Sequence, residues 1–237
     1  MLTAAVLGIS AFITSGISTI TGMGGSIIFL AIMLVLLPPH IAIPLHAAVQ
    51  IISNGSRISL FWRSICWKTC LILCIPAVVG IVIGRQFVTA LNPNVIRIML
   101  ALFILFSVYF PTSKNRETWP RWSFAIAGGI GGTITMLIGA IDPIIAPFFL
   151  HSRLRKEELI ATKACCQAII HFMKIIGFGT LGFTFQEHVG MITFLGLLVI
   201  VGSYVGQHLL QRISERHFVI AFKTLLTLTA LQLIFIT

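Results

Sequence analysis

Apolar residues run along the chain in long stretches that short polar segments separate. The stretches cover residues 2–37, 41–61, 68–90, 95–111, 121–150, 158–180, 189–209 and 217–236. A helix of about 20 apolar residues crosses the hydrocarbon core of a bilayer, and nearly all of these stretches reach that length. The pattern therefore predicts an all-α polytopic membrane protein, with a single membrane domain over residues 1–237 and no extramembrane module.

Polar and glycine positions in one half of the chain match those in the other when the sequence is compared with itself. A shift of 117 residues places Gly22 on Gly139, His46 on Lys163, Gln50 on Gln167, Asn54 on His171 and Arg57 on Lys174. A shift of 122 residues places Gly80 on Gly202 and Gly84 on Gly206. Such matches are rare against an apolar background, so they predict two repeats, residues 1–111 and 121–237, joined near residues 112–120.

The first apolar stretch of each half is too long for one crossing. Residues 2–37 would extend about 54 Å as a straight helix, compared with a hydrocarbon thickness of about 30 Å. The middle of this stretch reads Thr-Gly-Met-Gly-Gly-Ser, which weakens a helix interior. The matching segment, residues 139–143, reads Gly-Ala-Ile-Asp-Pro and predicts a new helix with Asp142 as N-cap and Pro143 in its first turn. Both stretches are therefore predicted to be broken helices.

The distribution of Lys and Arg among the loops indicates how the broken stretches lie. If each forms a re-entrant hairpin with no net crossing, eleven of these residues fall on one side and three on the other; single crossings would divide them seven and seven. Cytoplasmic loops collect Lys and Arg, so the hairpin is favoured. Three transmembrane helices then follow each hairpin. This odd number inverts the second repeat and puts both termini on the non-cytoplasmic side.

The overall composition supports a location in the membrane. Hydrophobic residues make up 57% of the chain and charged residues 9%, and the mean hydropathy is +1.05. A soluble domain of this length would carry more charge. The net charge of +10 lies in short loops without a basic, aromatic-rich run, so we expect a lipid bilayer and no nucleic acid as partner.

One helix of each half carries polar side chains at every fourth position. These stripes are His46, Gln50 and Asn54, followed by Arg57, in the first half, and Lys163, Gln167 and His171, followed by Lys174, in the second. Side chains at this spacing share one helical face. Polar groups are costly in lipid and usually face a cavity or a transport pathway. The alternative is hydrogen bonding between helices, with Arg57 and Lys174 reaching the membrane interface.

The stripes supply hydrogen-bond donors and positive charge, and Asp142 is the one acidic residue near them. The predicted helix starts near residues 24–26 and 142–143 would add free N–H groups, which favour anions. A small anionic solute is therefore expected to bind between the halves. The expected binding residues are Gly24, Gly25, Ser26, His46, Gln50, Asn54, Asp142, Lys163, Gln167 and His171. The glycines could instead only allow close helix packing.

Two further roles stay open at this stage. Asp142 could carry a proton, although capping its helix and neutralising Lys163 is the favoured role. Cys66, Cys70 and Cys74 share a helical face, but no carboxylate joins them, which favours simple packing. A thiol of Cys165 or Cys166 could lie near the site.

No catalytic trio, zinc motif or phosphate-binding loop occurs, so we expect no catalytic residue, no cofactor and no metal ligand.

At these glycines and prolines the sequence resembles the TauE/SafE sulfite exporter family. The family has a glycine-rich stretch near the start of each half, then apolar residues, a proline and a pair of small residues. Residues 22–26 and 128–132 resemble the glycine stretches, Pro147 the proline and residues 161–162 (Ala-Thr) the small pair. Departures occur at Leu30, which stands opposite Pro147, and at His46, and they concern the substrate more than the fold. Asp142-Pro143 also replaces a glycine triplet.

The resemblance implies a transporter of sulfite, sulfonates or other small sulfur-containing anions in the bacterial inner membrane. Alternating access between two inverted repeats is the expected mechanism. A membrane-embedded enzyme and a non-catalytic membrane subunit are the alternatives. An enzyme would have only Asp142 and His171 as an acid–base pair, and a subunit has little reason to bury charges. The scarcity of carboxylates disfavours cation transport. The sequence leaves the direction, the coupling ion and the oligomeric state, including a homodimer, open.

Overall fold

Helices form the regular structure throughout the part of the chain that the computed structural model describes, which is residues 2–21, 24–109, 118–209, 223–224, 227–228 and 230–235. The α-helices are α1 (Leu2–Thr21), α2 (Gly25–Leu36), α3 (Pro39–Phe61), α4 (Trp67–Val88), α5 (Pro93–Tyr109), α6 (Ser123–Ile138), α7 (Asp142–Leu150), α8 (Lys156–Thr180) and α9 (Val189–Leu209). Two 3₁₀ turns, η1 (Trp62–Ser64) and η2 (Phe185–His188), precede α4 and α9. The all-α class is confirmed. Half of the expected stretch 217–236 and most of the joining segment 112–120 lie outside the described residues.

Both long apolar stretches are interrupted, as predicted. The helix α1 ends at Thr21 and α2 begins at Gly25, after Gly24 with a φ of 88°. The helix α6 ends at Ile138, and Gly139 follows with a φ of 85° before α7 begins. Only glycine adopts a positive φ without strain, so glycines stand at both interruptions for a backbone reason.

Four helical segments are long and apolar enough to cross a membrane. They are Leu2–Thr19, Trp67–Val88, Glu157–Thr180 and Phe185–Gly206. Three shorter helical segments, Gly25–Leu36, Pro93–Phe106 and Ser123–Ile138, are also apolar. The helix α3 has 23 residues, but its polar stripe lowers its hydropathy. The chain therefore forms a multi-pass bundle in which some helices are too short to cross alone.

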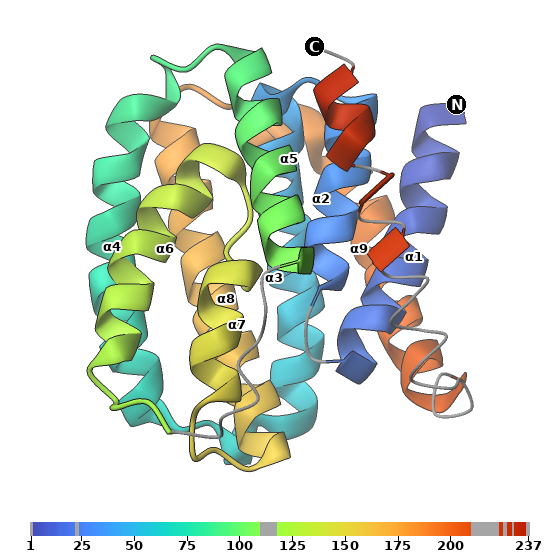
Figure 1. The fold of residues 1–237 in the computed structure, drawn as a ribbon. Helices are drawn as coiled ribbons and strands as arrows, with labels where there is room; N and C mark the ends of the chain where they lie inside the picture. Colours follow the sequence, from blue (N-terminus) through green and yellow to red (C-terminus); the bar gives the residue numbers. More distant parts are fainter. Residues whose placement is uncertain are drawn as a thin grey trace.

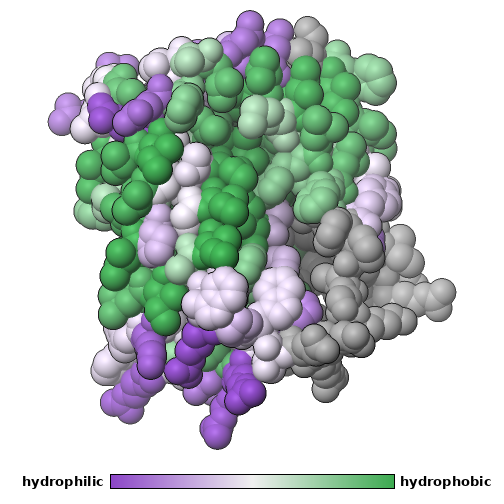
Figure 2. Space-filling model, turned by 60° about the vertical axis from the view of Figure 1, so that its left-hand side comes forward, coloured by the Kyte–Doolittle hydropathy of each residue, from purple (hydrophilic) through white to green (hydrophobic). Residues whose placement is uncertain are grey.

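The outer surface has the character of a lipid-facing one. Figure 2 shows a broad hydrophobic band on the face that includes α4, with hydrophilic residues gathered at its upper and lower edges. On α4, Leu71, Ile75 and Val79 are spaced four residues apart and are more than half exposed. The four tryptophans, Trp62, Trp67, Trp119 and Trp122, are all exposed and lie beside the α3–α4 connection or the start of α6. Tryptophan is enriched where a membrane meets water, so this end of the bundle has the composition of an interface.

Glycines bring the helices into close contact at two interfaces, between α4 and α6 and between α1 and α9. A Cβ atom added to Gly80 would lie 2.2 Å from the carbonyl oxygen of Gly129, and one added to Gly202 would lie 2.2 Å from that of Phe12. Gly128 and Gly132 lie inside α6 and pack in the same way on α4. Small residues let membrane helices approach closely. The glycine run of the second half therefore packs helices, whereas the break lies further along at Gly139.

The helix boundaries repeat at the spacings found in the sequence. The helices α2 and α7 begin 117 positions apart, at Gly25 and Asp142, and α3 and α8 begin at Pro39 and Lys156, also 117 positions apart. The helices α4 and α9 begin 122 positions apart. Figure 1 shows α2 and α7 starting near the middle of the bundle and running to opposite ends, with α3 packed against α8 between the halves. The start of α1 and residues 230–235 lie at the same end (Figure 1).

Candidate functional site

The first residues of α2 and α7 meet in the middle of the bundle. The hydroxyl of Ser26 on α2 donates a hydrogen bond to Oδ2 of Asp142 on α7. The ammonium nitrogen of Lys163 on α8 lies 2.6 Å from Oδ1 of the same carboxylate. All three side chains are more than nine-tenths buried. Their contact joins both helix interruptions through one ion pair, as expected for a carboxylate that neutralises Lys163.

Asp142 does not cap its helix, so that part of the prediction is wrong. Ile141 occupies the N-cap position, no side chain bonds to the free N–H groups there, and Asp142 is the first helical residue. Its carboxylate is directed to Ser26 and Lys163 instead, because a charged partner binds a carboxylate more strongly than a backbone N–H does. Pro143 lies in the first turn as expected.

The two polar stripes face each other across the contact of α3 with α8. The Nε2 atom of His46 lies 2.9 Å from the carbonyl oxygen of Ser26 and donates its proton to it. The rings of His46 and His171 meet edge to face, with centroids 5.7 Å apart. Gln50, Asn54, Lys163 and Gln167 are buried as well. The structure thus brings His46 of the first stripe together with His171 of the second and with the start of α2.

Several polar atoms in this region have no hydrogen-bond partner among the described residues. They are Nδ1 of His46 and His171, Nδ2 and Oδ1 of Asn54, and Nε2 of Gln167. A buried polar atom without a partner costs about 1–3 kcal/mol. Five such atoms within two facing stripes indicate groups that are held ready for a ligand or for water.

A small cavity lies beside the stripe of α3. Its walls are Thr14, Ser15 and Ser18 of α1, Gly25 and Ser26 of α2, Gln50 and Ser53 of α3, and Val199 of α9. It has an empty volume of about 160 Å³ but no room for a water-sized sphere. A Cβ atom on Gly25 would lie 2.0 Å from the carbonyl oxygen of Thr14, so Gly25 allows α1 to approach. The helices α1 and α2 are therefore tightly packed beside this cavity.

The hydroxyls of α1 at this cavity were missed from the sequence. Thr14 bonds to the carbonyl of Ser10 in its own helix at 2.7 Å, and Ser15 bonds across to Val199 at 2.6 Å. Hydroxyls satisfied in this way are tolerated in apolar helices and hardly change their hydropathy. In the sequence, only the spacing of these hydroxyl residues within an otherwise apolar stretch could have indicated that they line a cavity.

Arg57 and Lys174 lie inside the bundle, with side chains that are 4% and 0% exposed. The alternative that they reach the membrane interface is therefore wrong. Lys174 donates to the carbonyl oxygen of Gly139 at 2.9 Å, at the interruption between α6 and α7, and lies 3.4 Å from the Thr135 hydroxyl. Arg57 donates from Nη2 to the Ser53 hydroxyl at 3.1 Å. The ion pair of Asp142 and Lys163 is internally neutral, so these two residues supply the excess positive charge.

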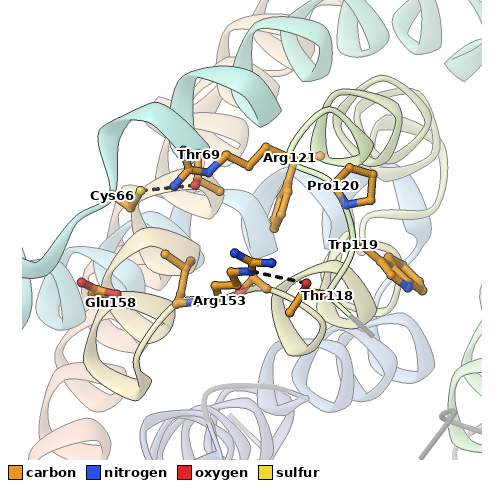
Figure 3. A pocket seen from close by; sticks show the side chains of 11 residues that line it. Cys66, Thr69, Thr118, Trp119, Pro120, Arg121, Arg153 and Glu158 are labelled. Atoms are coloured by element: carbon orange, nitrogen blue, oxygen red, sulfur yellow. Dashed lines mark hydrogen bonds between the residues drawn. The ribbon is translucent and has the colours of Figure 1, made fainter. Parts of the chain in front are cut away.

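A wider cleft of about 680 Å³ opens at the end of the bundle where the tryptophans lie. It is lined by Cys66 and Thr69 of α4, the segment before α6, and the connection from α7 to α8. Figure 3 shows Arg121 and Arg153 among its walls, with Nε of Arg153 3.4 Å from the Thr118 hydroxyl. Basic side chains therefore border the cleft from two segments that are distant in sequence.

A comparison with protein families places this geometry in context. The model of the family described as Sulfite exporter TauE/SafE matches residues 7–233. The chain belongs to the TauE/SafE sulfite exporter family. The match covers both interruptions and both stripes, and it confirms the resemblance that the glycines and prolines indicated. TauE/SafE proteins are membrane transporters, which fits the multi-pass bundle. No curated protein and no solved structure matches the chain significantly.

Proposed function

We propose that this TauE/SafE protein is a secondary transporter of a small sulfur-containing oxyanion, sulfite or a sulfonate, that works by alternating access. This proposal rests on the buried polar atoms of α3 and α8 that have no hydrogen-bond partner among the described residues. The same two helices carry the buried basic residues Arg57 and Lys174. Donors and excess positive charge stabilise an oxyanion by charge-assisted hydrogen bonds. No described carboxylate other than Asp142 lies near enough to favour a cation instead.

The anion would bind between the starts of α2 and α7. Gly24, Gly25 and Ser26 would offer the positive end of α2, and Gln50 and Asn54 would face it from α3. From α8, Gln167, His171 and Lys163 would complete the shell, with His46 oriented by its bond to Ser26. Asp142 would hold Lys163 in place, because a buried ammonium without a counter-ion is too costly in a membrane.

The two halves, residues 1–111 and 121–237, would be inverted repeats. Three observations support this: the helix starts repeat at 117 and 122 positions, α2 and α7 run to opposite ends, and α1 packs on α9 as α4 packs on α6. In folds of this kind one half rocks against the other around a central site.

The end of the bundle with the tryptophans and the basic cleft would face the cytoplasm. At this end, Arg63, Arg121, Arg153 and Arg155 lie in connections and Lys68 lies in the first turn of α4, and cytoplasmic loops collect such residues. The cleft would be the vestibule through which the anion reaches the bundle. The membrane would be the bacterial inner membrane, with both termini on its outer side.

The test is solute flux into proteoliposomes that contain the full chain. Gln50→Ala and Gln167→Ala should each reduce the initial rate of sulfite or sulfonate flux at least about tenfold, the effect of losing one or two hydrogen bonds to a charged group. Gln186→Ala is the matched control, since Gln186 is exposed in η2 and should leave the rate unchanged. If both buried variants transport as the wild type does, the site is wrong. If the wild type carries no small anion, the function is wrong.

A further inference from the structure

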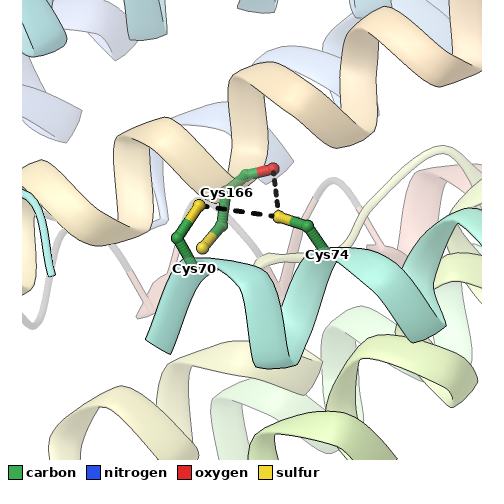
Figure 4. A group of neighbouring side chains, drawn as sticks. All are labelled: Cys70, Cys74 and Cys166. Atoms are coloured by element: carbon green, nitrogen blue, oxygen red, sulfur yellow. Dashed lines mark hydrogen bonds between the residues drawn. The ribbon is translucent and has the colours of Figure 1, made fainter. Parts of the chain in front are cut away.

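Four buried cysteines meet where α4 packs against α8. Cys70 and Cys74 come from α4, and Cys165 and Cys166 from α8. The sulfur of Cys70 lies 3.8 Å from that of Cys74 and 3.7 Å from that of Cys165. The sulfurs of Cys70, Cys74 and Cys166 all lie within 4.8 Å of one another (Figure 4). Packing, the role favoured from the sequence for Cys70 and Cys74, did not anticipate that thiols of α8 would join them.

The spacing of these sulfurs fits a single metal ion at their centre. Metal–thiolate bonds are about 2.3 Å long, so three sulfurs around one ion lie roughly 4 Å apart. The sulfurs of Cys70 and Cys74, 3.8 Å apart, already have this separation, and no two of the three sulfurs are more than 4.8 Å apart. No carboxylate or imidazole of the described residues belongs to the group, so its donors are sulfur alone.

The identity of the donors selects the class of ion. Soft thiolate ligands favour Cu(I), zinc and iron–sulfur clusters over hard cations. Structural zinc almost always takes four protein ligands, and Cys165, which approaches Cys70, does not belong to the group of three mutually close sulfurs. Three sulfurs satisfy the coordination of Cu(I), so this group needs no fourth ligand to hold it.

We propose that Cys70, Cys74 and Cys166 form a binding site for one Cu(I) ion between α4 and α8. Each thiol that binds as a thiolate releases its proton to the solution, and the copper keeps its oxidation state throughout. The bound ion ties a helix of the first half to a helix of the second, next to Gln167 on α8. Binding therefore stabilises the closed packing of α4 on α8. The existence of the site does not depend on which solute the protein transports.

The test is an anaerobic titration of the purified full chain with Cu(I), in competition with a chromophoric Cu(I) chelator. We expect one Cu(I) per chain and a rise in the melting temperature that grows with free Cu(I). Cys70→Ser, Cys74→Ser and Cys166→Ser should each weaken the affinity at least about 100-fold. Cys66→Ser is the matched control, because Cys66 lies outside the group and bonds to Thr69 instead.

Size-exclusion chromatography establishes that each variant is folded, and Cys166→Ala replaces any serine variant that aggregates. Wild-type protein that binds no Cu(I), or that binds it equally well after Cys74→Ser, would overturn the proposal. Fewer than five titratable thiols per chain in freshly purified, unfolded protein would also overturn it, since the cluster would then hold a disulfide. Because the readout is copper binding, the result is independent of the flux measurements.

Discussion

The ammonium group of Lys163 and the carboxylate of Asp142 lie 2.6 Å apart between α8 and α7, with neither side chain more than 7% exposed. The pair sits where the two interruptions meet, because Ser26 of α2 bonds to the same carboxylate. In this position it neutralises two charges that the membrane interior would not tolerate separately. The contact therefore holds the centre of the bundle together without contributing net charge to the site.

Removing one member of this pair should destabilise the protein more than removing both. Asp142→Asn and Lys163→Gln should each lower the free energy of unfolding by about 3–5 kcal/mol, because each leaves a buried charge without its partner. The double variant should recover most of this loss, since no charge remains. Thermal unfolding in detergent measures the difference, with Glu187→Gln on the exposed turn η2 as a control that should change nothing. Equal losses in all three variants would contradict the role given to the pair.

Asn54 should matter for transport and not for stability. Its side chain is 0% exposed, and neither amide atom has a hydrogen-bond partner among the described residues. Asn54→Leu removes two unpaired polar atoms and keeps the branched shape of the side chain, so the free energy of unfolding should stay the same or rise by about 1 kcal/mol. Anion flux should fall at least about tenfold.

The control for this variant is Ser59→Leu, at an exposed position of the same helix, which should alter neither quantity. The informative comparison is between melting temperature and flux measured on one preparation. A clear loss of stability in Asn54→Leu would mean that the amide has a structural partner, and it would remove Asn54 from the site.

Several features of this architecture could be predicted because they depend on local sequence. Glycines weaken a helix whatever surrounds them, so the helix breaks near Gly24 and Gly139 could be recognised from the sequence. Polar residues four apart share a face in any helix, so the stripes were visible as well. The pairing of Lys163 with Asp142 could be predicted from charge, since Asp142 is the one acidic residue among the predicted binding residues.

Other features depend on how helices pack, which the sequence does not encode locally. The depth of Arg57 and Lys174 was open, because a long basic side chain near a helix end can reach water or turn inward. Cys70 and Cys166 are far apart in sequence, and only the packing of α4 on α8 brings their sulfurs together. The cap expected at Asp142 failed for the same reason, as partners from two other helices compete for the carboxylate.

Gly139 should be intolerant of a side chain, whereas Gly179 should accept one. Gly139 has a φ of 85°, and an added Cβ would lie 2.8 Å from Cδ2 of Leu30. Gly139→Ala should therefore lower the free energy of unfolding by about 1–3 kcal/mol. Gly179 lies in the last turn of α8 with nothing within 4 Å, so Gly179→Ala should be neutral or stabilise by up to about 1 kcal/mol. Melting temperatures of the two variants in the same detergent test the contrast.

Arg57 should control the affinity for the anion. It is buried, and its described hydrogen bonds go only to Ser53 of its own helix, so its guanidinium has further N–H donors for a ligand. Arg57→Gln should raise the KM of transport about 10- to 100-fold, equivalent to roughly 1.5–3 kcal/mol for a hydrogen bond to a charged group. Arg57→Lys should keep part of the affinity, because it retains the charge and loses the planar fork.

Lys174 provides the comparison that separates charge from structure. Its ammonium donates to the carbonyl of Gly139, so Lys174→Gln should reduce both thermal stability and anion affinity, whereas Arg57→Gln should reduce affinity alone. Arg63→Gln, at an exposed position in η1, is the control for both. Saturation curves of flux against sulfite concentration give KM and the maximal rate separately. If Arg57→Gln leaves KM unchanged and reduces only the maximal rate, Arg57 acts in the conformational change of the transport cycle and does not bind the anion.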